Sequence, residues 1–93
     1  MKKIAMLHTS SATLAMMQQL IADIMPEVEV MHLVEESMIK QVMKAGGVTP
    51  NIAARIADYV HIAEKADCDI FITACSSIGT AVEQCQFLTP LQI

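Results

Sequence analysis

The segment ITACSSIG, residues 72–79, places a cysteine directly after an apolar run and before two serines and a glycine. A helix beginning just behind Cys75 would favour the thiolate, because unpaired amide N–H groups and the helix dipole stabilise negative charge. Ser76 and Ser77 add hydroxyl donors, and Gly79 lets the backbone approach an anion closely. This pattern suits a thiolate that moves a proton or attacks carbon beside a bound carboxylate. A buried cysteine before a serine helix cap fits the same residues equally well.

A second group of hydroxyl side chains follows the first apolar run, in the segment LHTSS at residues 7–11. Thr9, Ser10 and Ser11 can bind an anion, and they can also cap the helix that follows. One role does not exclude the other. His8 could carry a proton, but a lone histidine at a strand end is more often simply hydrogen-bonded, and we favour that reading.

The remaining polar groups give weaker signals. Glu35 and Glu36 form an acidic turn, for which a solvated helix start is the preferred interpretation. Cys68 and Cys85 are predicted to be packing residues. The sequence contains no convincing metal-ligand spacing, no G-x-G-x-x-G motif and no Walker loop, so neither a metal nor a nucleotide cofactor is expected.

Apolar runs suited to buried strands alternate with segments of helical periodicity. Strands are predicted at residues 2–8, 27–34 and 67–74, and residues 87–93 either begin a fourth strand or form a linker. The first helix ends at Pro26, a second ends at the glycine pair 46–47, and a third begins with Thr49 and Pro50. The apolar stripe of the first helix consists of Leu14, Met17, Ile21 and Ile24, and that of the third consists of Ile52, Ile56, Tyr59 with Val60, and Ala63.

This alternation predicts an α/β fold in three layers, with a three- to four-stranded parallel sheet flanked by helices, like a single Rossmann-like or flavodoxin-like lobe. Ligands of such sheets bind beyond the carboxyl ends of the strands. Cys75 and the loop that contains Thr9 are therefore expected at the same edge of the sheet.

Length and composition limit the class of protein further. The 93 residues make one small domain, and the hydrophobic content of 54% suggests a face that a second domain or subunit covers. The net charge is −4 and the basic residues are scattered, which argues against nucleic acid as a partner. No apolar run approaches the ~20 residues of a membrane span. Three cysteines without a C-x-x-C pair indicate reduced thiols and a cytoplasmic location.

Several segments resemble the N-terminal lobe of the aspartate/glutamate/hydantoin racemase superfamily, over nearly all of the chain. IAMLHTS resembles the first strand and substrate loop of the family, and HLVEESMI resembles a segment in which aspartate is commoner than Glu35. GGVTPNIAARI is similar to the helix entry that follows, and DIFITACSSIG is similar to the strand that carries the first catalytic cysteine. The TACSSIG stretch is the most specific of these similarities.

The resemblance implies an enzyme with two similar α/β lobes, an active site between them, and neither pyridoxal phosphate nor a metal. One cysteine removes the α-proton of an amino acid or related carboxylate, and a second cysteine returns a proton to the opposite face. Cys75 would be the first acid/base. Thr9, Ser10, Ser76 and Ser77 would hold the substrate carboxylate. Isomerases and decarboxylases share this fold, so the reaction is open within the class.

The sequence departs from the family pattern in one respect that bears on catalysis. Residues 1–93 correspond to one lobe, and the second lobe with its cysteine is absent from the sequence. We therefore expect either a fragment or truncated product, or a homodimer that brings two copies of Cys75 together. The alternative is a non-catalytic lobe that binds a carboxylate or a partner chain. A thiol phosphatase is disfavoured, because Ala81 stands where that chemistry needs an arginine.

Overall fold

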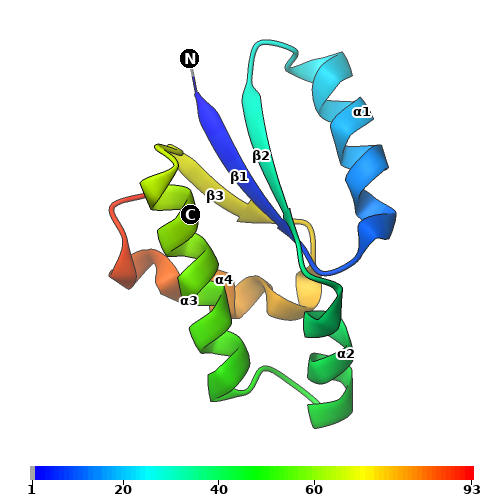
Figure 1. The fold of residues 1–93 in the computed structure, drawn as a ribbon, viewed down its shortest axis with the longest axis vertical. Helices are drawn as coiled ribbons and strands as arrows, with labels where there is room; N and C mark the ends of the chain where they lie inside the picture. The colour runs from blue at the N-terminus through cyan, green and yellow to red at the C-terminus, as the bar shows by residue number, and fades with distance from the viewer. Residues whose placement is uncertain (1) are drawn as a thin grey trace.

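Three parallel strands form the centre of residues 2–93, the part of the chain that the computed structural model describes. The strand order is β2-β1-β3, with β1 (Lys3–His8) between β2 (Glu29–Val34) and β3 (Ile70–Thr73) (Figure 1). The helices are α1 (Leu14–Ile24), α2 (Glu36–Ala45), α3 (Pro50–Lys65) and α4 (Gly79–Gln84), with short 3-10 turns η1 (Ser11–Thr13), η2 (Ser76–Ile78) and η3 (Cys85–Leu88). The predicted α/β fold with a parallel sheet is confirmed.

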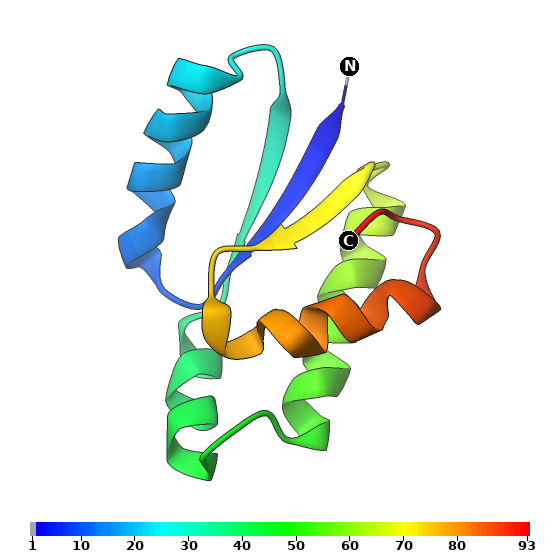
Figure 2. The same ribbon diagram turned by 180° about the vertical axis from the view of Figure 1, so that it is seen from behind.

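The helices lie on both sides of the sheet. Figures 1 and 2 show α1 on one side and α3 with α4 on the other, while α2 lies beyond the carboxyl ends of the strands, next to α3. Alternate residues of a strand point to opposite faces, so Ala5 and Leu7 of β1 face the larger helical layer while Met6 and His8 face α1. The main core lies between the sheet and the larger layer. It includes Phe71 of β3, which is completely buried.

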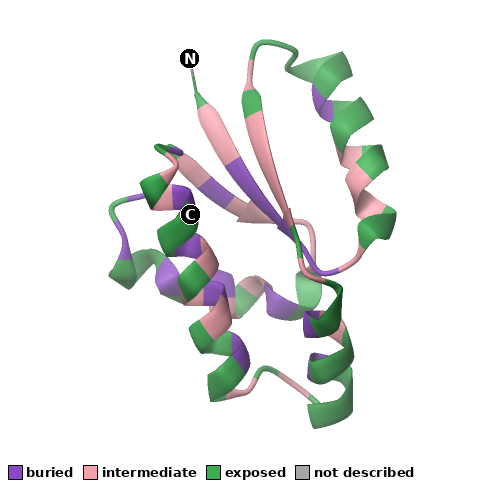
Figure 3. Cartoon of the chain, in the orientation of Figure 1, coloured by how far each residue is buried: buried purple, intermediate pink, exposed green. Residues whose placement is uncertain are grey.

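The apolar periodicity of the third predicted helix is confirmed in α3. Ile52, Ile56, Val60 and Ala63 are all buried and belong to the core cluster. The purple bands on the inner side of this helix in Figure 3 mark these buried positions. Predicting the stripe was straightforward because one face of α3 is buried in the core along the helix, so the helical period of 3.6 residues appears directly in the sequence.

The corresponding prediction for α1 is only partly right. Ile21 is buried, but the side chain of Ile24 is 66% exposed, and Leu14 and Met17 are half-buried. α1 covers a face that includes His8 and His32, so its contact with the sheet is shorter and more polar than an apolar stripe implies.

The C-terminal residues add a single strand-like contact. Ile70 and Gln92 form an isolated parallel bridge, in which the Phe71 amide donates to the Gln92 carbonyl at 2.8 Å. Residues 85–88 form η3 instead of a strand. Of the two interpretations for residues 87–93, the strand therefore applies only at this one bridge.

Replacing Thr49 by alanine is expected to lower the free energy of unfolding by about 1 kcal/mol, which corresponds to a melting temperature lower by about 4–8 °C. Thr49 is the N-cap of α3, and its hydroxyl accepts a hydrogen bond from the Ile52 amide at 3.3 Å. Thermal unfolding followed by circular dichroism measures the effect. Thr49→Ser keeps the hydroxyl and should remain close to the wild-type protein; an equal loss in both variants would contradict a capping role.

Candidate functional site

The carboxyl ends of β1 and β3 are held side by side by their backbones. Leu7 pairs with Thr73, and the Leu7 carbonyl accepts hydrogen bonds from the Ala74 amide at 3.1 Å and from the Thr73 hydroxyl at 2.9 Å. The loops after these strands begin one or two residues later. The chain therefore brings the Thr9 loop and Cys75 to the same edge of the sheet, as the parallel topology requires.

Cys75 lies at the point where extended chain turns into helix. It is the N-cap residue of η2, it is half-buried, and its amide donates to the Thr73 hydroxyl at 3.1 Å. The residue lines a pocket of about 480 Å³ between β3 and α4. Ser76, Gly79 and Glu83 line the same pocket. The thiol thus borders open space that can accept a small molecule, with a hydroxyl and a carboxylate nearby.

The two serines after Cys75 face different spaces. Ser76 lines the Cys75 pocket, whereas Ser77 lines a second pocket of about 310 Å³ between the start of α3 and α4. Both side chains are exposed. Of this pair, Ser76 is placed to meet a ligand beside the thiol.

Thr9 and Ser10 lie in the turn between β1 and η1. Thr9 is buried, and Ser10 caps η1 by accepting a hydrogen bond from the Ala12 amide at 3.1 Å. Neither residue lines the Cys75 pocket or the Ser77 pocket. The predicted capping role of this segment is therefore confirmed. The loop and Cys75 lie at the same edge of the sheet, but they do not line a common pocket.

The other two cysteines lie inside the protein. Cys68 and Cys85 are buried in the core cluster, and burial raises the pKa of both thiols. The Cys85 thiol also donates to the Ala81 carbonyl at 3.4 Å. Their prediction as packing residues is confirmed. Within residues 2–93, Cys75 is the cysteine that is not buried.

A pair of histidines is the polar feature that sequence reasoning missed. His8 is completely buried, and its Nε2 lies 2.8 Å from Nδ1 of His32 on the neighbouring strand. Its Nδ1 lies 2.7 Å from the Thr13 hydroxyl. Burial lowers the pKa of both imidazoles, and the neighbouring His32 lowers that of His8 further. His8 and His32 alternate with apolar residues on adjacent strands, and this pattern would have suggested that they share one face.

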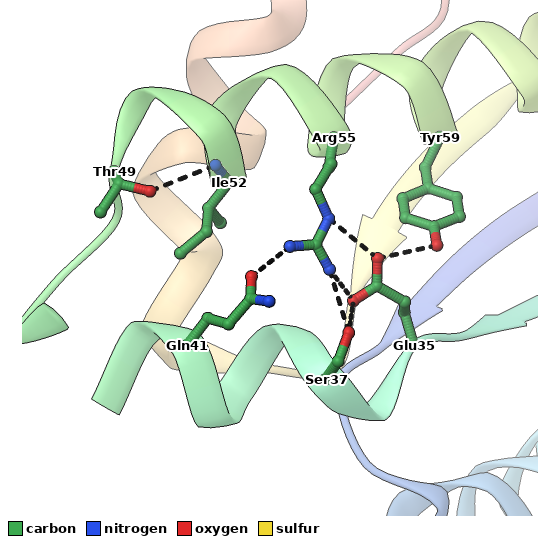
Figure 4. A network of polar contacts seen from close by, with 7 residues as sticks. All are labelled: Glu35, Ser37, Gln41, Thr49, Ile52, Arg55 and Tyr59. Atoms are coloured by element: carbon green, nitrogen blue, oxygen red, sulfur yellow. Dashed lines mark hydrogen bonds and ion pairs between the residues drawn. The ribbon is translucent and has the colours of Figure 1, made fainter. Parts of the chain in front are cut away.

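Glu35 is the N-cap of α2, so the predicted helix start is confirmed, but its side chain belongs to a polar network and is not solvated as the prediction had it. Arg55 of α3 forms an ion pair with its carboxylate, and Tyr59 and Ser37 donate hydrogen bonds at 3.0 and 2.8 Å (Figure 4). Arg55 also donates to Gln41 of α2. The Arg55 guanidinium lowers the pKa of Glu35, with smaller lowering contributions from Ser37 and Tyr59. Arg55 and Tyr59 lie 20 and 24 positions further along the chain, so no local sequence pattern indicated them as partners of Glu35.

Comparisons with protein-family models, with curated proteins and with solved structures gave no match. Within residues 2–93, no helix combines the length and the apolar character that crossing a membrane requires. In the same range, no group of three or more histidine, cysteine, aspartate or glutamate side chains is arranged to hold a metal ion.

Acidification is expected to destabilise the fold, beginning below pH 6.5. The pKa values of His8 and His32 are lowered from 6.5 in the folded protein, so the unfolded chain binds protons first as the pH falls. Their contribution to stability is complete above pH 6.5 and declines below it, with a limiting slope of about 1.4 kcal/mol per pH unit per proton. The lowered pKa of Glu35 adds a second decline below pH 4.5. Urea unfolding at a series of pH values measures both, and His32→Gln should reduce the first decline.

Proposed function

We propose that this chain is a lobe of a cofactor-independent racemase or related isomerase of the Asp/Glu/hydantoin type, which acts on the carbon alpha to the carboxylate of an amino acid or alpha to the ring carbonyl of a hydantoin. Cys75 is its acid/base. The observation that carries the proposal is the half-buried Cys75 at the carboxyl end of β3, on the wall of a pocket of about 480 Å³ that Ser76 also lines. The segments that resemble the Asp/Glu racemase superfamily support the same assignment.

The reaction needs a base and a means of stabilising negative charge. In the proposed step the Cys75 thiolate takes the α-proton, and the electron pair of the C–H bond is delocalised into the substrate carboxylate. Hydrogen-bond donors aimed at the carboxylate oxygens stabilise this carbanion-like state. Ser76 is within the pocket, and the hydroxyls of Thr9, Ser10 and Ser77 are the further candidates from the same sheet edge. A thiol is suited to return the proton at neutral pH.

The position of a single thiol in the pocket limits the stereochemical outcome of the reaction. Cys75 approaches the substrate from one face, and Cys68 and Cys85 are buried away from the pocket. One thiol can remove and return a proton on the same face, which exchanges the α-hydrogen but keeps the configuration. Inversion needs a second acid on the opposite face, supplied by a second lobe or by a second copy of the chain.

The test is incubation with each enantiomer of aspartate, glutamate and 5-substituted hydantoins in D2O. Loss of the α-proton signal in the NMR spectrum measures exchange, and chiral chromatography measures inversion. We expect exchange of at least one substrate, and exchange without inversion identifies a single-lobe active site. Absence of exchange with all of these substrates would overturn the proposal.

A non-catalytic lobe that binds a carboxylate or a partner chain is the second candidate. It is favoured by the burial of the other two cysteines, since within residues 2–93 no second thiol reaches the Cys75 pocket. Binding of succinate or aspartate, measured by calorimetry and unaccompanied by exchange, would support this candidate over the first.

A further inference from the structure

The histidine pair forms a continuous chain of hydrogen bonds with the turn that follows β1. Both ring nitrogens of the buried His8 are occupied, one by the Thr13 hydroxyl at 2.7 Å and the other by His32 at 2.8 Å. The two rings are tilted by 37° with their centroids 5.0 Å apart. The Thr13 hydroxyl in turn contacts the Ser10 carbonyl at 3.4 Å. The chain therefore runs from β2 through β1 into the Thr9–Ser10 loop.

The direction of each hydrogen bond follows from the end of this chain. The Ser10 carbonyl only accepts, so the Thr13 hydroxyl donates to it and accepts from His8 Nδ1–H. The other nitrogen of His8, Nε2, is then an acceptor and receives the Nδ1–H of His32. This leaves Nε2 of His32 without its proton. His32 lines a cavity of about 250 Å³ between α1 and β2, where a proton can reach it.

His32 is the titratable residue of the cavity between α1 and β2, and His8 is its hydrogen-bond partner. The other residues of the cavity come from α1, β2 and the turn between them, and none of them is charged; they are Gln18, Ile21, Ala22, Met25, Pro26, Val28 and Val30. Glu35, the carboxylate directly after β2, is directed towards Arg55 and Tyr59 on the opposite helical layer (Figure 4).

We propose that His8 and His32 are positioning residues for the Thr9–Ser10 loop, and that the pair binds one proton and transmits its charge through Thr13 to the Ser10 carbonyl. The loop's part in substrate binding rests on the proposed function. A proton added at His32 Nε2 makes this ring an imidazolium that still donates Nδ1–H to His8. Transfer of that Nδ1 proton to His8 Nε2 neutralises His32 and leaves His8 as the imidazolium, whose bond to Thr13 is then charge-assisted.

A second proton can bind only at a lower pH, when the hydrogen bond between His8 and His32 breaks. With both rings protonated, His8 Nε2–H and His32 Nδ1–H would face each other across 2.8 Å, and two positive charges would lie side by side. The two histidines must therefore titrate as a coupled pair whose steps are separated. The one-proton state is the one that tightens the turn, because it strengthens the His8–Thr13 bond.

NMR of the 15N-labelled protein from about pH 8 to about pH 5 tests this inference without substrate. The imidazole nitrogens of His8 and His32 should titrate in two steps more than about one pH unit apart. The amide signals of Ser10 and Thr13 should shift with the midpoint of the first step. Independent titration of the two rings, or turn amides that do not move with them, would overturn the inference.

Thr13 variants separate transmission from simple packing. Thr13→Val keeps the shape but lacks the hydroxyl, so the histidines should still titrate together while the Ser10 amide loses its shift. Thr13→Ser restores the hydroxyl and should restore the shift. An unchanged Ser10 shift in Thr13→Val would overturn the transmission. If the wild-type protein exchanges α-protons, Thr13→Val should also remove the histidine-linked pH dependence from KM while leaving kcat close to the wild-type value.

Discussion

Replacing Cys75 by alanine is expected to reduce α-proton exchange by a factor of about 1000 or more, to the background of the solution. General acid–base catalysis by a positioned side chain contributes about 10²–10⁴-fold, and no other thiol in residues 2–93 borders the Cys75 pocket to replace it. Cys75 is half-buried at a helix start, so the fold should tolerate the change. Exchange rates measured by NMR in D2O give the ratio directly.

Cys68→Ala provides the matched control for this variant. Cys68 is buried in the core, so its loss should lower the melting temperature while the exchange rate per folded molecule stays at the wild-type level. Cys75→Ser, in which a much weaker acid replaces the thiol, should resemble Cys75→Ala. If α-proton exchange persists in Cys75→Ala, Cys75 is not the acid/base, even though the protein is active.

Replacing Glu35 by alanine is expected to lower the free energy of unfolding by about 2–3 kcal/mol. Removal of one partner of a buried ion pair costs about 3–5 kcal/mol, and because the side chains of Glu35 and Arg55 are 18% and 24% exposed we expect a loss at or just below the lower end of that range. Arg55, Tyr59 and Ser37 would all lose their acceptor in this variant. Urea unfolding at neutral pH measures the change.

Tyr59→Phe is the graded control for the same network. It removes one hydrogen bond to Glu35 and leaves the ion pair with Arg55 intact, so about 1 kcal/mol should be lost. If Glu35→Ala lowers the free energy of unfolding no more than Tyr59→Phe does, the ion pair with Arg55 contributes little to stability beyond the Tyr59 hydrogen bond. The network joins the end of β2 to α3, so its loss should also loosen the α2–α3 packing.

The fold was predictable where side chains repeat with a regular period against an apolar layer. The stripe Ile52, Ile56, Val60 and Ala63 marked α3 correctly, and the strand predicted at residues 27–34 ends at the same residue as β2, which begins two residues later, at Glu29. Gly46 ends α2 in the left-handed conformation, with φ of 79°, as the glycine pair indicated. The same reasoning failed at Ile24, which lies in the last turn of α1 and is 66% exposed.

The candidate site was predictable to the level of the sheet edge but no further. The apolar run before Cys75 marked the end of a strand, and parallel topology assigns that end to the same edge as Thr9. Which serine shares a pocket with the thiol depends on the turn of η2, which a sequence pattern does not specify. The His8–His32 and Glu35–Arg55 pairs each join residues at least twenty positions apart, and only the packed chain brings them together.

The unequal covering of the two sheet faces has a consequence for how the molecule loosens. α1 contributes one buried side chain, Ile21, whereas α3 contributes four. The attachment of α1 therefore depends strongly on the polar contacts at its start, where Thr13 meets His8. Under heat or mild denaturant, α1 should detach as a local event while the other layer and the sheet keep their structure. Such a detachment would uncover Met6 and the two imidazoles, and would make this face the molecule's first point of contact with chaperones and proteases.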